Sequence, residues 1–173
     1  LNYEGQATVL AQSEDYALFI KALLDLHQVE TRNFVSLQHD GWLEQAIRVQ
    51  EEFDQFLWSV ELGGYYNTAN DSSQDLIVRE RSYADNGTPA ANGVAIANLV
   101  RLALLTEDLS YLDRAFQALQ AFSSVMKDYP QACPSLFTAL DWYRHCTLIR
   151  TDSEQLDSLI AQYLPTSVLK IET

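Results

Sequence analysis

Two carboxylates lie next to helical stretches at positions where they could face a ligand. Asp15 opens the first helical stretch, and Asp85 lies in a long segment, residues 61–92, that leads into a later one. Two carboxyl groups on either side of a ligand are the usual machinery for cleaving glycosidic bonds. Asp15 and Asp85 are therefore the candidate catalytic residues, and sugar cleavage is the chemistry they would support.

The segment 61–92 supplies most of the candidate binding residues. At about thirty residues it greatly exceeds the usual connection of about four to six, and loops of that length are usually functional or disordered. Its aromatic and β-branched residues predict ordered, partly extended pieces, one of them over residues 75–79. Tyrosine rings can stack on sugars, and guanidinium groups bind anions. The candidate ligand-binding residues are Tyr16, Tyr65, Tyr66, Asn67, Arg79, Tyr83, Thr88 and Asn92.

Each candidate also has a structural interpretation that the sequence leaves open. Asp15 is placed to cap or stabilise the first turn of its own helix. Asp85, in the sequence Asp-Asn-Gly, is typical of a turn. The tyrosines could equally pack the loop against the rest of the protein.

Other chemistries have no matching pattern. An epimerase would use histidines as proton carriers, but His27, His39 and His145 are remote from the helix starts named above. The chain has no zinc-type spacing of histidine and cysteine, no glycine-rich phosphate loop and no Gly-x-Ser-x-Gly turn. We expect no metal and no cofactor.

Buried and amphipathic helical patterns alternate along the chain. Residues 15–26 are apolar at nearly every helical angle, which predicts an inner helix covered on most sides. Residues 42–60, with Asp40 as N-cap, show one apolar stripe and predict an outer helix with one wet face.

The alternation repeats after the long segment. Thr88 is predicted to cap, and Pro89 to begin, a second buried helix. An amphipathic helix capped by Asp108 follows, and residues 136–149 predict a fifth helix. The tail Ser-Val-Leu-Lys-Ile is expected to form a short strand or to fray.

Two concentric layers of helices would produce this alternation. We therefore predict an all-α fold, a partial (α/α)6 toroid of helical hairpins, with a short extended loop or β-hairpin inserted between the second and third helices. A helical solenoid is the alternative, but the inner helices begin at unequal intervals, near residues 14, 89 and 134. In a toroid these helices run the same way, so their N-termini gather at one end and offer free N–H groups.

Composition limits the partners. With 173 residues and 47% hydrophobic content, the chain is expected to form a single domain, 1–173. The net charge of -13 disfavours nucleic acids and anionic membrane surfaces. The chain has no apolar run of membrane-spanning length and no signal-like start, so a cytoplasmic location is expected.

Several motifs resemble a known family. EDYALFIKALLDL, GGYYNT, LIVRERSYADNGTPAANGVAIANLVRLALLT and YPQACPSLFTALDW resemble the C-terminal half of the spermatogenesis-associated, thioredoxin-domain proteins, over about residues 12–145. The resemblance implies a six-hairpin toroid similar to N-acylglucosamine epimerases and several glycosidases, of which this chain would hold the last hairpins. Asp15, Tyr16, Arg79, Tyr83, Asp85, Pro89 and Asn92 keep the family pattern.

Two departures from that pattern concern chemistry. Asn67 stands where the family has an aspartate, and Ala90 and Ala91 stand where it has serine and glycine. We therefore expect a carbohydrate-enzyme-like scaffold of weak or absent activity, with a small carbohydrate as ligand. The alternative is an interaction module whose open side docks a second copy or the missing N-terminal portion of the same protein.

Overall fold

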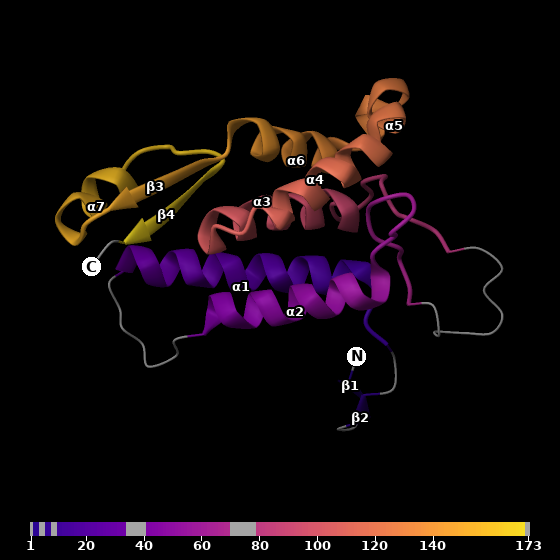
Figure 1. The fold of residues 1–173 in the computed structure, drawn as a ribbon, viewed down its shortest axis with the longest axis horizontal. Helices are drawn as coiled ribbons and strands as arrows, with labels where there is room; N and C mark the ends of the chain where they lie inside the picture. The colour runs from indigo at the N-terminus through magenta and orange to yellow at the C-terminus, as the bar shows by residue number, and fades with distance from the viewer. Residues whose placement is uncertain (1, 4–5, 8–9, 34–40, 70–78, 172–173) are drawn as a thin grey trace.

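The computed structural model describes residues 2–3, 6–7, 10–33, 41–69 and 79–171, which are mostly helical (Figure 1). The all-α fold class is confirmed, with a small parallel sheet added. The expected cap Asp40 and the extended residues 75–78 lie outside the described part. The elements are β1 (Asn2–Tyr3), β2 (Gln6–Ala7), α1 (Ser13–Asn33), α2 (Trp42–Leu57), α3 (Ala91–Thr106), α4 (Ser110–Ala121), α5 (Ser123–Asp128), α6 (Pro134–His145), β3 (Thr147–Thr151), α7 (Ser153–Ile160) and β4 (Ser167–Ile171).

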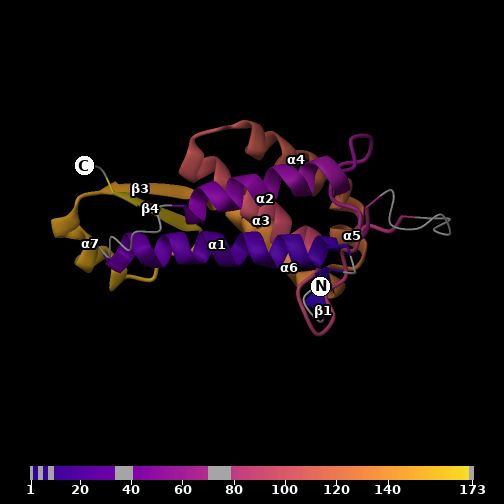
Figure 2. The same ribbon diagram turned by 90° about the horizontal axis from the view of Figure 1, so that it is seen from below.

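The helices form two layers. Helix α3 lies between α1 and α6 (Figure 1). Helices α2 and α4 lie together on one side of these three (Figure 2). Arg114 on α4 pairs with Asp54 on α2, which joins the two outer helices. Most of α3 is buried, whereas α2 and α4 each keep an exposed face. The predicted alternation of buried and half-exposed helices is thus confirmed for α2, α3 and α4.

Helix α1 is less covered than its sequence predicts. Its buried face includes Ala17, Ile20 and Leu24. The opposite face exposes Leu18, Phe19, Leu26 and Val29, with exposed fractions between 37% and 54%. The expectation of an inner helix covered on most sides is wrong for this chain, because α1 packs on α2 and α3 along one side only.

The second buried helix begins later than predicted. It starts at Ala91, so Thr88 does not cap it and Pro89 does not occupy its first position. Ala90 is the N-cap residue, and its backbone N–H donates to Asp85 Oδ1 at 2.7 Å. The carboxylate of Asp85, five residues upstream, thus satisfies one of the free N–H groups at the start of α3. At the next amphipathic helix, Asp108 Oδ1 accepts from Ser110 N at 2.9 Å, close to the expected cap.

Helix α6, which corresponds to the fifth predicted helix, ends earlier than predicted. It stops at His145, and residues 147–151 form β3, which pairs in parallel with β4 through the crossover helix α7. The predicted helix to residue 149 is wrong because the β-branched residues there pair with the distant C-terminal segment. The expected C-terminal strand is confirmed. The Gln28 amide of α1 bonds both Leu169 N and Leu169 O of β4, at 3.0 and 3.2 Å, and docks the sheet on α1.

The connection between α2 and α3 is irregular in its described part. An isolated bridge joins Trp58 and Tyr65, and Asn67 N donates to Glu80 O at 2.8 Å. Gly63 and Gly64 both have left-handed backbone, with φ of 74° and 76°, which turns the chain between these contacts. The sequence predicted either an extended loop or a β-hairpin between these helices, and the described residues fit the extended loop. No described helix is both long enough and apolar enough to cross a bilayer.

Candidate functional site

The starts of α1, α3 and α6 lie at the same end of the molecule, where the described loop residues 61–69 and 79–90 also lie (right in Figure 1). Thr88 Oγ1 donates to Glu14 Oε1 at 2.8 Å, which joins the segment before α3 to the first turn of α1. Asp85 joins the same segment to α6 through Ser135. The predicted gathering of the inner-helix N-termini is therefore present.

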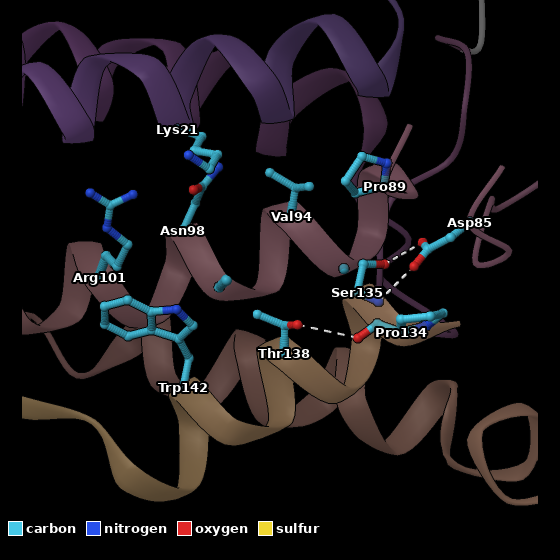
Figure 3. A pocket seen from close by; sticks show the side chains of 12 residues that line it. Lys21, Asp85, Pro89, Val94, Asn98, Arg101, Pro134, Ser135, Thr138 and Trp142 are labelled. Atoms are coloured by element: carbon cyan, nitrogen blue, oxygen red, sulfur yellow. Dashed lines mark hydrogen bonds between the residues drawn. The ribbon is translucent and has the colours of Figure 1, made fainter. Parts of the chain in front are cut away.

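Asp85 holds the starts of two helices together. Its Oδ1 accepts from Ala90 N at 2.7 Å and from Ser135 Oγ at 2.6 Å, and its Oδ2 accepts from Ser135 N at 2.7 Å (Figure 3). Its own N–H donates to Ala132 O at 2.8 Å. Both carboxyl oxygens are therefore engaged by the protein, so Asp85 acts as a clamp between the loop and α6.

Asp15 stabilises the start of its own helix. It is exposed, and its Oδ2 accepts from Gln12 N at 2.9 Å, which is the backward half of a capping box. Asp15 and Asp85 each bind nearby backbone groups and lie at the same helical end. The helix-start interpretation of Asp15 is thus realised, whereas Asp85 bridges the loop to α6 in place of the expected turn role. One oxygen of Asp15 has no protein donor among the described residues.

Tyr65 and Asn92 are buried rather than open to solvent. Asn92 accepts from Tyr65 N at 2.7 Å and donates to Tyr65 O at 3.0 Å and Ser82 O at 2.8 Å. The Tyr65 ring stacks on Phe53 with centroids 3.9 Å apart. The pKa of the Tyr65 hydroxyl is raised well above its usual range. The larger cause is burial, and the smaller cause is the neighbouring Asp54 carboxylate. These two residues fasten the loop to the core.

The remaining candidates are partly accessible. The Tyr16 ring stacks on Phe53 at 5.1 Å, and burial raises the pKa of its hydroxyl. Arg79 lies over the Tyr66 ring at 4.0 Å and donates to Thr68 O. The half-buried candidates are Tyr16, Tyr66, Asn67, Arg79, Tyr83 and Asp85, and the exposed ones are Asp15 and Thr88.

A small polar hollow opens among these helix starts. It has a volume of about 120 Å³ and lies between the first turn of α1 and the segment before α3. The Asn67 and Thr88 side chains line it, together with Gln12, Glu14, Ser82 and Asn86. Two predicted binding residues therefore line a shared concavity, while Tyr65, Tyr66, Arg79 and Tyr83 are not among its lining residues.

A larger groove of about 320 Å³ lies between α1 and α6, with α3 as its floor (Figure 3). Lys21, Arg101 and Trp142 line it, and none of them was a sequence candidate. Asp85 and Pro89 lie at its other end. Arg101 had a usable signal, because it is a charged residue in the otherwise apolar stretch of α3. Lys21 and Trp142 had none, since neither residue type is unusual on a helix.

Neither concavity is arranged around a metal centre. Among the described residues, no group of three histidine, cysteine or acidic side chains could hold a metal ion. His27 lies within α1, His145 ends α6, and His39 lies outside the described part. The residues that line the two concavities offer hydrogen bonding, an aromatic ring and charged groups.

Comparison with known proteins places the chain in a family. No family model matches it. It is 35% identical over 127 residues to spermatogenesis-associated protein 20 of Rattus norvegicus and 34% identical to the Homo sapiens protein, in each case over 73% of this chain. An uncharacterised Caenorhabditis elegans protein is 30% identical over 137 residues. The chain spans about 15% of the length of the rat and human relatives. It belongs to the spermatogenesis-associated protein 20 family and corresponds to part of that family's C-terminal region.

Proposed function

We propose that the chain is part of a carbohydrate-enzyme-like helical toroid and holds a small sugar-type ligand at the N-terminal ends of its inner helices. The polar hollow carries this proposal. Its amide and hydroxyl side chains, from Asn67, Ser82 and Thr88, supply donors and acceptors that suit sugar hydroxyls. At about 120 Å³ it is smaller than a typical ligand pocket, so it would hold one end of a sugar. The parallel inner helices, covered on one side by α2 and α4, are what an arc of a toroid requires.

Catalysis by this chain is proposed to be weak or absent. A general acid or nucleophile needs a carboxyl oxygen that can reach the substrate. Both oxygens of Asp85 already accept hydrogen bonds from Ala90 and Ser135. Asn67, at the position where the resembling family has an acid, donates from its backbone to Glu80 and accepts from Ser82 N at 2.9 Å. The site is therefore suited to binding more than to bond cleavage.

A sugar titration tests this proposal. Calorimetry with glucose, N-acetylglucosamine and their β-linked disaccharides would be run on the wild type, Ser82→Ala and Thr88→Ala, because both residues line the hollow. Asp113→Asn, which changes an exposed acid on α4, is the control. Binding that is weakened by the first two variants and unchanged in the control supports the site. If none of these sugars binds the folded wild type, the proposal is wrong.

A cytoplasmic role in carbohydrate metabolism belongs to the same proposal. Cys133 and Cys146 are both free thiols. Free cysteines fit a reducing compartment, where disulfides are rare. Fractionation of cells that express the natural protein would test the location.

The second candidate function is an interaction module, favoured by the exposed stripe of α1. Leu18, Phe19, Leu26 and Val29 recur at helical spacing on one face. We propose that a second copy covers this stripe in an antiparallel two-fold pair. Lys21 and Asp25 pair with each other on the same helix, so each copy would bring both signs of charge to a two-fold interface.

Light scattering after gel filtration distinguishes this candidate from the first. The wild type should form dimers, and Leu26→Glu should shift it to monomer. Val60→Glu is the matched control, because Val60 is 81% exposed and lies outside α1. A wild-type monomer would contradict the self-pairing and leave a further segment of a longer chain as the occupant.

A further inference from the structure

The groove over α3 is distinct from the polar hollow, although Pro89 lines both. Its floor is apolar and comes from Gly93, Val94 and Ala97 of α3. The indole of Trp142, on α6, forms one wall (Figure 3). A cavity of about 320 Å³ with an apolar floor and a few polar groups is within the range that binds small molecules.

One end of the groove carries an excess of positive charge. Arg101 NH2 bonds Asp25 Oδ1 at 2.8 Å, and Lys21 Nζ bonds Asp25 Oδ2 at 2.6 Å. Among the described residues two cations thus share one carboxylate, an excess of one positive charge in this cluster. Lys21 and Arg101 both line the groove, whereas Asp25 does not.

Arg101 is incompletely satisfied. The residue is only 7% exposed, and among the described residues its buried Nε has no hydrogen-bond partner. Its guanidinium carbon lies 5.9 Å from the centre of the Trp142 ring. Burial lowers the pKa of Arg101 below its usual value, despite the opposing effect of Asp25. A buried guanidinium is costly while one of its donors lacks a partner, and an acceptor atom of a ligand would remove that cost.

The opposite end of the groove fixes the orientation of a ligand. Asp85 lies there with both oxygens engaged, and Ser135 and Pro134 lie beside it (Figure 3). The negative charge of a carboxylate disfavours a second anion at that end. A ligand with one acid group would therefore direct it toward Lys21 and Arg101 and lay its body along the floor.

We propose that this groove binds a small monocarboxylate with an apolar body, such as an arylalkanoic acid. The carboxylate pairs with Lys21 and Arg101, and the apolar body packs on Val94 and Ala97 against the Trp142 indole. This site takes a different ligand class from the polar hollow, so the two proposals stand or fall separately.

The test compares 3-phenylpropanoate with the neutral 3-phenylpropanamide, using NMR of the Trp142 indole N–H. The acid should shift this resonance and bind at least about tenfold more tightly than the amide, an ordinary ratio for a charge-assisted contact. Lys21→Gln should weaken acid binding several-fold and leave amide binding unchanged. Thr138→Phe, which fills the groove from α6, should abolish binding of both.

Lys127→Gln is the matched control, because Lys127 is an exposed lysine on α5 outside the groove. Lys21 is chosen for substitution because it is more exposed than Arg101. A substitution of the buried Arg101 would remove a partner of Asp25 and destabilise the fold, which would confuse the result. Equal affinity for acid and amide, an unaffected Lys21→Gln variant, or no shift at Trp142 would each overturn the proposal. A glucose titration in the same samples reports separately on the polar hollow.

Discussion

Tyr65 is fully buried and still has partners for its hydroxyl. It donates to Asp54 Oδ1 at 2.6 Å and accepts from Gln50 Nε2 at 2.9 Å. Arg114 from α4 completes the network by pairing with the other oxygen of Asp54. Burial raises the pKa of the Asp54 carboxyl, although these hydrogen bonds oppose the rise. The network therefore links the loop to both outer helices and depends on each of its members.

Removing the Tyr65 hydroxyl should destabilise the fold. Tyr65→Phe keeps the ring stack on Phe53 but leaves Asp54 without its phenol donor. Asp54 Oδ1 keeps its hydrogen bond from Gln50 Nε2 at 2.9 Å. We therefore expect the free energy of unfolding to fall by about 1.5–3 kcal/mol, the usual contribution of one hydrogen bond to a charged group. Urea unfolding followed by circular dichroism measures this. Tyr163→Phe, at a residue 91% exposed, should change nothing, and equal stability of both variants would contradict the proposed role of the network.

The same tyrosine should make the protein sensitive to alkali. Unfolded tyrosine loses its proton near pH 10, whereas folded Tyr65 keeps it to higher pH because its pKa is raised. The folded state then holds more protons than the unfolded state, so stability falls as the pH rises above about 10. Each such group contributes a slope of up to about 1.4 kcal/mol per pH unit.

Urea unfolding between pH 8 and pH 11 checks this prediction. Tyr65→Phe should lose part of the alkaline slope. Tyr16 and Tyr111, whose pKa values are also raised by burial, should sustain the remainder. An identical slope in the wild type and the variant would show that Tyr65 ionises equally in both states.

At the scale of elements, Gly93 sets the approach of α3 to α6. A Cβ atom at this position would lie 2.1 Å from Ser135 Oγ and 2.7 Å from the Ser135 carbonyl carbon. Because part of the clash is with backbone, rotation of the serine side chain cannot relieve it. The helices would have to separate, which would disturb the Asp85 clamp and the floor of the groove.

Gly93→Ala should therefore be strongly destabilising despite the better helix propensity of alanine. We expect a loss of about 1–3 kcal/mol or more, the range for overpacking a tight contact. Gly87→Ala is the control, because a Cβ there meets nothing within 4 Å. Thermal unfolding of the two variants should give a clearly lower midpoint for Gly93→Ala only. A neutral Gly93→Ala would show that the two helices can separate at little cost.

The helices themselves could be predicted because their apolar periodicity is local. Element boundaries that depend on distant partners could not. Ala91 begins α3 because Asp85 binds the N–H of Ala90, and Ile149 leaves the helical pattern because it pairs with Leu169 of β4. A helical pattern is defined by neighbouring residues, and it contains no information about Asp85 at the start of α3 or about Leu169 beside Ile149.

The position of the polar hollow was predictable from the sequence, whereas its lining residues were predictable only in part. The shared helical end follows from the parallel inner helices, and Asn67 and Thr88 do line a concavity there. Tyr65 belongs to the core, because a ring with a polar tip is equally suited to a sugar face and to a buried network. Lys21 and Trp142 meet only when α1 and α6 pack on either side of α3, which the sequence pattern does not specify.

At the scale of the whole molecule, the inner layer of helices is covered on one side by α2 and α4 and lined on the other by the groove. The β3–β4 pair closes the end opposite the helix starts (Figure 1). The face of α1 that carries Leu18, Phe19, Leu26 and Val29 has no covering element among the described residues. Exposed apolar patches of this kind usually mark interfaces.

Self-association through that stripe must overcome the net charge of -13 on each copy. The free energy gained by burying apolar side chains depends little on salt. Repulsion between two negatively charged copies is screened by salt, because the Debye length falls from about 30 Å at 0.01 M to about 3 Å at 1 M. Dimerisation should therefore strengthen over this range, which sedimentation velocity can measure. Leu26→Glu should stay monomeric throughout, and Val60→Glu should follow the wild type. A dimer that weakens with salt would instead mean that ion pairs between the copies dominate the interface.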